Sequence, residues 1–316
     1  MVLFQIIFRN SLIFAVELEI MNTRKVALFA AFISTIIYGM NYTIAKDVMP
    51  NFVKPNGFIL LRVAGALLLF WIAGFFVKKE KIDLKDFKYI FLAGLFGAGL
   101  NMLTFFKGLN LTTPINASVI TVMVPIIVFI ISVIFLKEKL IRHRIIGVMI
   151  GLLGAVVLIV YGHHSAVNAP DIVTGNIFVF FNAIFYSLYL ITVKKLINKY
   201  NPLVFVKWIY LFGFLIVLPF GFQDFLEIKW TTMPTNIWNS ILFVVIGTTF
   251  LTYILNLFAL TKLKPTTVSA FVYLQPVVAT VFALMLKSDS LDPIKITAVV
   301  FIFIGVYLVS KPPKVK

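Results

Sequence analysis

The sequence predicts an all-α integral membrane protein with ten transmembrane helices, arranged as two inverted repeats of five helices each. Of its 316 residues, 61% are hydrophobic and 13% are charged, whereas a soluble domain carries about 25% charged residues. Apolar runs of spanning length recur along the chain, and a helix needs roughly 20 such residues to cross the hydrocarbon core. The second half of the sequence also repeats the first half.

The N-terminal stretch is not part of the predicted fold. Arg9 interrupts two short apolar runs, and Glu17 and Glu19 follow them, so no span is predicted there. A signal peptide would need a basic start and a small-residue cleavage site, and neither is evident. We therefore treat residues 1–24 as an extension that is either interfacial or precedes an alternative start at Met21.

Ten spans are predicted from residue 25 onwards. Each is apolar around its circumference, as expected of helices buried in lipid and in one another, whereas barrel strands would be shorter and alternating. The spans lie near residues 26–46, 56–77, 88–107, 114–136, 144–161, 173–194, 203–221, 238–260, 265–287 and 293–310. An outer connecting loop at 163–172 separates a first repeat at 25–162 from a second repeat at 173–311.

The internal repeat relates each half of the chain to the other at two nearly equal offsets. The fourth span returns 151 residues later, where Pro276 matches Pro125, and the first span returns 148 residues later, where Tyr186 matches Tyr38. Because five is odd, the second copy must enter the membrane from the opposite face. Such an inverted repeat is typical of carriers that open alternately to each side around a site near the midplane.

Basic residues gather on one side of the predicted membrane. Of the 28 Lys and Arg residues, 19 lie in inner segments and 6 in outer segments if the N-terminus is cytoplasmic, with Arg9, Arg62 and Lys207 left out of the tally. Cytoplasmic loops carry the positive excess in membrane proteins. We therefore expect a multi-pass protein of the cytoplasmic (inner) membrane with both termini in the cytoplasm, and we do not attribute the net charge of +16 to nucleic-acid binding.

Several segments of both repeats carry a recognisable family pattern. They include YGMNYTIAK (38–46), LLRVAGALL (60–68), and the long paired segments at 108–140 and 259–286. Together they resemble the EamA-like branch of the drug/metabolite transporter superfamily, over about residues 25–310. The resemblance implies ten helices and transport, often export, of small metabolites such as amino acids. The chain departs from the family pattern at Tyr38, where tryptophan is usual, at Asp289, where glutamate is common, and at Ala298, the counterpart of Gly147.

The inverted repeat and this resemblance predict a transporter rather than an enzyme. We expect it to move an amino acid or a similar zwitterionic or anionic solute by alternating access, in the export direction, with a multidrug or organic-cation efflux carrier as the alternative. The expected partners are this small-molecule solute and the lipid bilayer, with a homodimer left open and nucleic acid excluded. We expect neither a cofactor nor a prosthetic group.

An intramembrane enzyme and a channel are the rival classes. No run of the GxSxG, HExxH or Walker type appears in the sequence. His163, His164 and Asp171 share one outer loop, but adjacent histidines with one distant carboxylate indicate a solvated loop more than a metal site. The inverted repeat and the lack of a charged ring argue against a channel.

Polar side chains inside the spans are the candidates for binding a solute, because they are costly in lipid and usually face the bundle interior. Tyr38 and Asn41 share one helix face, and Tyr186 and Tyr189 repeat that spacing in the sixth span. Hydrogen bonding between helices is the alternative role. The candidates are Tyr38, Asn41, Arg62, Asn101, Asn116, Tyr186, Tyr189, Tyr253, Asn256 and Gln275, with Ser269 as a further position. We expect spans one, three, four, six, eight and nine to line the cavity.

Basic residues inside or at the ends of spans have two possible roles. Arg62 could pair with an anionic group of the solute, or it could snorkel outward or brace a carbonyl of a neighbouring helix. Lys46 and Lys107 lie at outer helix ends, where we expect them to snorkel. Together with Lys54 and Arg62 they would make an outer vestibule positive.

Two further features of the spans bear on mechanism. Pro125 and Pro276 predict matched kinks, which are either hinges or static bends. No Asp or Glu lies inside a predicted span away from its ends. Proton coupling through a buried carboxylate is therefore not expected.

Overall fold

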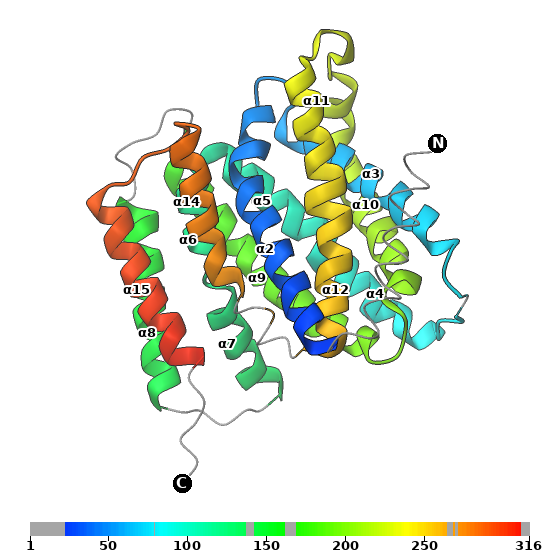
Figure 1. Ribbon diagram of the computed structural model, residues 1–316, viewed down its shortest axis with the longest axis horizontal. Coiled ribbons are helices and arrows are strands. Elements are labelled where there is room, and N and C mark those ends of the chain that lie inside the picture. Colours follow the sequence, from blue (N-terminus) through cyan, green and yellow to red (C-terminus); the bar gives the residue numbers. More distant parts are fainter. Residues whose placement is uncertain are drawn as a thin grey trace.

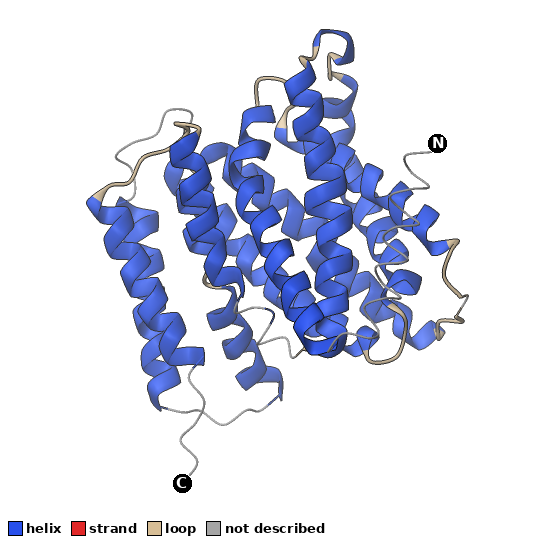
Figure 2. Cartoon of the chain, viewed as in Figure 1, coloured by secondary structure: helices blue, strands red, loops and turns tan. Residues whose placement is uncertain are grey.

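The computed structural model describes residues 23–78, 80–136, 142–161, 169–263, 268 and 271–310. Every regular element within these ranges is a helix (Figure 2). Seven helices are long and apolar enough to cross a membrane, and three shorter apolar helices cover Ile145–Val157, Phe271–Met285 and Pro293–Gly305. The all-α, multi-pass prediction is confirmed, whereas the count of ten spans stays a prediction. Residues 1–22, Glu138, His163, His164 and Ser269 lie outside the described ranges.

Two membrane helices in the first half of the chain begin with a proline. Pro55 and Pro114 each occupy the first turn of a helix, where the missing N–H would have no helical partner and the fixed φ already suits the helix. The helices of this half are α2 (Thr23–Val48), α3 (Pro55–Gly74), α4 (Phe87–Ala93), α5 (Leu100–Leu111), α6 (Pro114–Thr121), α7 (Val124–Leu136) and α8 (Arg142–Tyr161).

The second half follows the same order of elements. Its helices are α9 (Ile172–Ile197), α10 (Pro202–Leu226), α11 (Thr235–Leu242), α12 (Thr252–Lys262), α14 (Gln275–Met285) and α15 (Pro293–Ser310). Asp171 begins α9 by accepting a hydrogen bond from the N–H of Thr174 at 3.1 Å. That hydrogen bond holds the pKa of the exposed Asp171 carboxyl below its ordinary value.

The third span of each half is interrupted by a π-helical segment, which the sequence did not predict. Segment η2 (Gly94–Gly99) lies between α4 and α5, and segment η4 (Phe243–Leu251) lies between α11 and α12. The two segments occupy matching positions, because Gly94 and Val245 are 151 residues apart. A π turn shifts the backbone hydrogen bonds of a helix and is frequent at functional sites.

The fourth and ninth spans are broken near their middles, as the two prolines predicted. The helix α6 ends at Thr121 and α7 begins at Val124, one residue before Pro125. In the second half, the 3₁₀ turn η5 (Phe271–Leu274) precedes α14, in which Pro276 is the second residue. Proline removes an N–H donor and clashes with the preceding turn, so the regular α-helix of each span is interrupted next to the proline.

Helices from one half pack mainly against helices from the other half. The contacting pairs are α3 with α10, α8 with α15, α2 with α12, and α5 with α9 (Figure 1). At the edge of the molecule α8 and α15 approach closely enough that a Cβ on Gly305 would lie 2.6 Å from the carbonyl oxygen of Gly147. Small residues permit this kind of close approach between membrane helices. The two halves therefore interleave within one bundle.

Gly305→Ala is expected to lower the stability of the protein in detergent. The new methyl group would meet backbone atoms of α8, and overpacking of this kind costs about 1–3 kcal/mol. Gly247→Ala is the matched control, because its Cβ would lie 3.4 Å from the Phe243 ring, an ordinary contact. The midpoint of thermal unfolding, followed by size-exclusion chromatography, measures both variants. Equal midpoints would contradict the close α8–α15 packing.

Candidate functional site

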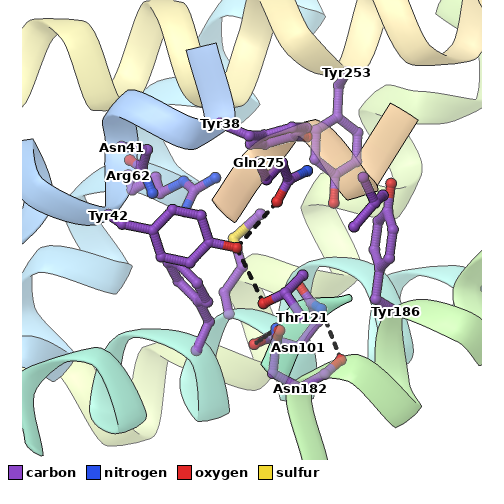
Figure 3. Close-up of a pocket in the computed structure, with 13 residues that line it drawn as sticks. Tyr38, Asn41, Tyr42, Arg62, Asn101, Thr121, Asn182, Tyr186, Tyr253 and Gln275 are labelled. Carbon is purple, nitrogen blue, oxygen red and sulfur yellow. Dashed lines mark hydrogen bonds between the residues drawn. The ribbon is translucent and has the colours of Figure 1, made fainter. Parts of the chain in front are cut away.

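A polar cavity lies in the middle of the bundle, next to both broken spans (Figure 3). Its volume is about 70 Å³, which is room for roughly five water molecules at about 10–15 Å³ each. The residues that line it are Tyr38, Asn41, Tyr42, Arg62, Asn101, Met102, Phe105, Thr121, Asn182, Tyr186, Tyr253, Val272 and Gln275. Arg62 is the one ionic side chain among them.

Arg62 reaches the cavity from α3 and is held on one side by segment η4. Its Nε donates to the hydroxyl of Thr249, and its Nη2 donates to the carbonyl oxygen of Thr248 at 3.2 Å. The guanidinium carbon also lies 5.0 Å from the centre of the Phe106 ring, a cation–π distance. Arg62 is buried, so it does not snorkel outward. It braces a carbonyl and borders the cavity at once.

Tyr42 joins the breaks of the two broken spans to α2. Its hydroxyl donates to Oε1 of Gln275, at the start of α14, over 3.0 Å. The same hydroxyl lies 3.0 Å from Oγ1 of Thr121, the last residue of α6 (Figure 3). One side chain therefore contacts both breaks, which belong to different repeats of the sequence.

The π-helical segments supply backbone acceptors next to the cavity. Tyr253 donates its hydroxyl proton from α12 to the carbonyl oxygen of Gly97 in η2, at 2.9 Å. Thr248, whose carbonyl accepts from Arg62, lies in the matching segment η4. Both segments therefore expose a carbonyl to a side chain from another helix, as altered helical geometry permits.

Asn101 and Asn182 connect α5 to α9 at the cavity wall. Asn182 donates its amide to the carbonyl oxygen of Asn101 at 2.9 Å, and Asn101 donates to the carbonyl oxygen of Asn182 at 3.3 Å (Figure 3). This reciprocal pair is hydrogen bonding between two helices, which polar side chains commonly form in membrane bundles.

Asn41 differs from the other amides of the cavity. It is buried in α2, and its Oδ1 has no hydrogen-bond partner within the part of the chain that the structure describes. A buried carbonyl oxygen of this kind is normally satisfied. The unsatisfied oxygen therefore marks a place where a donor group of a ligand would gain a hydrogen bond.

Seven of the ten candidate residues border the cavity: Tyr38, Asn41, Arg62, Asn101, Tyr186, Tyr253 and Gln275. Asn256 lines a smaller adjoining space of about 10 Å³, which shares Tyr38 and Tyr186 with the main cavity. Tyr189 lies behind the wall against Gly97, and Asn116 is buried in the first turn of α6. Their role in binding a solute stays a prediction.

Tyr42, Thr121 and Asn182 also line the cavity, although none of them was among the candidate residues. Tyr42 lies four residues after Tyr38, and Asn182 lies four residues before Tyr186. Residues four apart share a helix face, so the same spacing argument could have found both. Helix α3 was not among the spans expected at the cavity, although its residue Arg62 was a candidate; the structure adds α3 to the wall.

Lys46 does not snorkel, contrary to the interpretation from sequence. Its ammonium group donates to the carbonyl oxygens of Leu109 (2.8 Å), Asn110 (3.1 Å) and Thr112, which have no helical partner at the end of α5. Lys194, 148 residues later, donates to the carbonyl of Leu260 at the end of α12 over 3.0 Å. The two lysines therefore complete matching helix ends.

The expected positive vestibule is also weaker than predicted. Lys54 pairs with Glu227 on the surface, and this hydrogen-bonded carboxylate raises the pKa of the Lys54 ammonium above its ordinary value. Of the four cations expected to form the vestibule, Arg62 alone borders the central cavity.

Buried polar contacts tie together the ends of α6, α14 and α15 that lie beside Lys46. Asp289 pairs with Lys295 at 2.7 Å, and their side chains are 0% and 1% exposed. The other carboxylate oxygen of Asp289 accepts from the N–H of Ile115, in the first turn of α6, at 3.1 Å. Lys295 also donates to the carbonyl oxygen of Ser290 at 2.7 Å. These contacts join the loop before α15 to the first turn of α6.

Known proteins match this chain over nearly its whole length. The model of the EamA-like transporter family matches residues 25–160 and again 173–311. An uncharacterized transporter of Archaeoglobus fulgidus is 27% identical over 87% of this chain and 95% of its own length. The uncharacterized transporter YyaM of Bacillus subtilis is 23% identical over 87% and 90%, and a WAT1-related protein of Arabidopsis thaliana is 26% identical over 84% and 79%.

A solved crystal structure shares the fold. It aligns with a TM-score of 0.62 over 90% of this chain and 97% of its own length, at 17% sequence identity. At that identity the likeness concerns the arrangement of the helices.

Tyr42→Phe is expected to destabilise the protein while leaving the shape of its core unchanged. The variant removes one hydroxyl and leaves the buried Oε1 of Gln275 without its donor, which costs about 1–3 kcal/mol. Tyr161→Phe, at an exposed position of α8, removes the same atom at the surface. Thermal unfolding in detergent should separate the two variants by several degrees. If both midpoints match the parent protein, Tyr42 does not hold the two breaks together.

Proposed function

This chain belongs to the EamA-like transporter family, and on that premise we propose that it carries a small zwitterionic or anionic metabolite, such as an amino acid, through the central cavity by alternating access. The protein is a multi-pass membrane protein, and its family and the names of its relatives point to a transporter rather than an enzyme. The observation that carries the choice of solute is the Arg62 guanidinium at the cavity wall.

Arg62 gives the cavity a positive charge that no acidic side chain balances among the lining residues that the structure describes. None of the described residues that line the cavity is Asp or Glu, and a buried charge without a partner is costly. The contacts with Thr248 and Thr249 use Nε and Nη2, and within the described residues Nη1 has no hydrogen bond. A solute carboxylate would balance the charge and match the planar guanidinium with paired hydrogen bonds.

Asn41 adds a complementary group. Its buried Oδ1 needs a donor, which the ammonium group of an amino acid provides and a simple inorganic anion lacks. The positive charge at Arg62 also disfavours the alternative solute class, because an organic cation would be repelled inside a low-dielectric cavity. A zwitterion with adjacent acid and amine therefore fits these two residues best.

Alternating access is supported by the matched breaks, the matched π-helical segments, and the Asp289 contacts that join the loop before α15 to α6. The cavity of about 70 Å³ is small beside the ~300–1,000 Å³ of common ligand pockets, so entry or release requires the surrounding helices to separate. We propose that the two sequence repeats are inverted in the membrane and that the Asp289–Lys295 end faces outward.

The orientation of the protein in the membrane and the direction of transport are proposed from the loop charges and the family resemblance. The excess of basic residues in one set of loops supports cytoplasmic termini in the cytoplasmic membrane. The resemblance to EamA-like carriers supports export. Transport into everted membrane vesicles would support that direction, and uptake by right-side-out vesicles alone would oppose it.

Arg62→Ala is expected to weaken solute binding at least tenfold. The test is a melting-shift screen of the purified protein with neutral, acidic and aromatic amino acids, since a bound solute raises the unfolding temperature by mass action. Lys107→Ala, which removes a cation outside the cavity, should leave the shift unchanged. Asn41→Leu keeps a similar side-chain volume. It should weaken the binding of zwitterions more than the binding of simple carboxylates.

The solute proposal fails if a solute stabilises the parent protein and Arg62→Ala binds it with unchanged affinity. Arg62 also braces η4, so Arg62→Ala could fail to fold for reasons unrelated to the solute. Arg62→Lys is the control for this, because lysine keeps the positive charge but lacks the planar paired donors of the guanidinium. Binding that persists unchanged in both Arg62→Lys and Asn41→Leu would place the solute elsewhere.

The double variant Asp289→Asn/Lys295→Gln is expected to open the outward end more often. It replaces the buried Asp289–Lys295 ion pair by a neutral pair, so neither of these two positions keeps a charge without its partner. Asp292, 3.8 Å from the Lys295 ammonium, keeps the hydrogen bond from the backbone N–H of residue 295. The chain has no cysteine, so Thr121→Cys provides a single reporter thiol in the cavity wall. A membrane-impermeant maleimide added outside should label this thiol several-fold faster in the double variant. Glu227→Gln, which breaks the surface pair with Lys54, should not change the rate.

A further inference from the structure

A second pocket lies apart from the central cavity and is lined by residues from the end of α3, the start of α10 and the start of α4. Its volume is about 330 Å³, within the range of pockets that hold small molecules. We call it the interfacial pocket. Its lining residues that matter here are Trp71, Lys78, Glu80, Lys207 and Trp208.

Two aromatic rings and a lysine form one side of the interfacial pocket. The rings of Trp71 and Trp208 meet edge to face with centroids 5.4 Å apart, and the ammonium of Lys207 lies 5.1 Å from the Trp71 centroid. The stem of Lys207 passes Gly74, where a Cβ would lie 3.3 Å from its Cδ. The Lys207 side chain therefore packs along the pocket wall and does not extend freely into solvent.

The charge of this pocket is positive. Among the described residues that line it, Glu80 is the one acidic residue, and its Oε2 accepts a hydrogen bond from the backbone N–H of Asn201 at 3.0 Å. Within the described residues, neither Lys78 nor Lys207 forms an ion pair. Two ammonium groups therefore face the pocket against one carboxylate that is already hydrogen-bonded. An anion would be attracted to the pocket, and the rest of its lining is mostly apolar.

The position of the pocket indicates where the anion would come from. The apolar side chains beside it, Ile72, Phe75 and Phe76, are 41%, 79% and 67% exposed, as expected for a surface that contacts acyl chains. Tryptophan gathers at the headgroup level of membranes, and lysines there are drawn to anionic lipid. A ligand that joins a phosphate to two apolar tails matches both halves of this surface.

We propose that the interfacial pocket is a binding site for an anionic phospholipid, with its headgroup phosphate between Lys78 and Lys207 and its acyl chains along Ile72, Phe75 and Phe76. With the orientation proposed above, this is a lipid of the cytoplasmic leaflet. The site is distinct from the central cavity, so it does not depend on which solute the protein carries.

Native mass spectrometry of the delipidated full-length protein tests the proposal. Phosphatidylglycerol and phosphatidylcholine with identical acyl chains are titrated separately, and glycerol 3-phosphate serves as the soluble anion. We expect phosphatidylglycerol to bind at least tenfold more tightly than the other two ligands. Lys78→Gln/Lys207→Gln should remove this preference.

A matched control variant separates the pocket from general surface charge. Lys88→Gln/Lys195→Gln removes the same number of lysines. Both ammonium groups lie over the Tyr89 ring, 5.1 Å and 4.6 Å from its centroid, but neither lysine lines the pocket. This variant should keep the preference for phosphatidylglycerol. Brominated phosphatidylglycerol should also quench the fluorescence of Trp230→Phe/Trp238→Phe, which retains the two pocket tryptophans.

Three results would overturn the proposal. Equal binding of phosphatidylglycerol and phosphatidylcholine would remove the role of the phosphate charge. If both double-lysine variants lost the preference for phosphatidylglycerol equally, surface charge alone would attract the lipid. If glycerol 3-phosphate bound as tightly as phosphatidylglycerol, the pocket would be a site for free anions. The thermal midpoint of each variant, measured without lipid, identifies any variant that fails to fold.

Discussion

Lipid offers no hydrogen bonds, so each place where a membrane helix departs from α geometry must find its partners inside the protein. The structure meets this constraint with side chains from neighbouring helices. Tyr253 satisfies a carbonyl of η2, Arg62 satisfies one of η4, and Lys46 and Lys194 satisfy the carbonyls at the ends of α5 and α12. Tyr253 and Arg62 each bond across the two halves and so hold the interleaved helices together, whereas Lys46 and Lys194 each bond within their own half.

The same departures from α geometry explain where the cavity is. Breaks and π turns expose backbone polar atoms, and the side chains that reach them bring further polar groups to the middle of the bundle. Tyr42 illustrates this, since its hydroxyl contacts the breaks of both the fourth and the ninth spans. The structural and functional roles weighed for Arg62 are therefore compatible, because one edge of the guanidinium braces η4 while the residue still borders the cavity.

Much of the site could be predicted because a helix has a fixed period. Tyr38 and Tyr186 were identified by their matching positions, and both border the cavity. Asn116 does not, because it lies in the first turn of α6, away from the break that faces the cavity. The behaviour of Lys46 could not be predicted, since the carbonyls that hold its ammonium belong to residues more than 60 positions away.

The sequence by itself determined that this is an all-α membrane protein of two related halves, with matched breaks at Pro125 and Pro276. Composition, run length and proline chemistry act locally, so they can be read along the chain. Only the tertiary structure decided that the helices of the two halves interleave and that π turns replace α turns in both third spans. It also decided that Arg62 borders the cavity with no carboxylate among the described lining residues. These features depend on contacts between distant segments, and local periodicity carries no information about them.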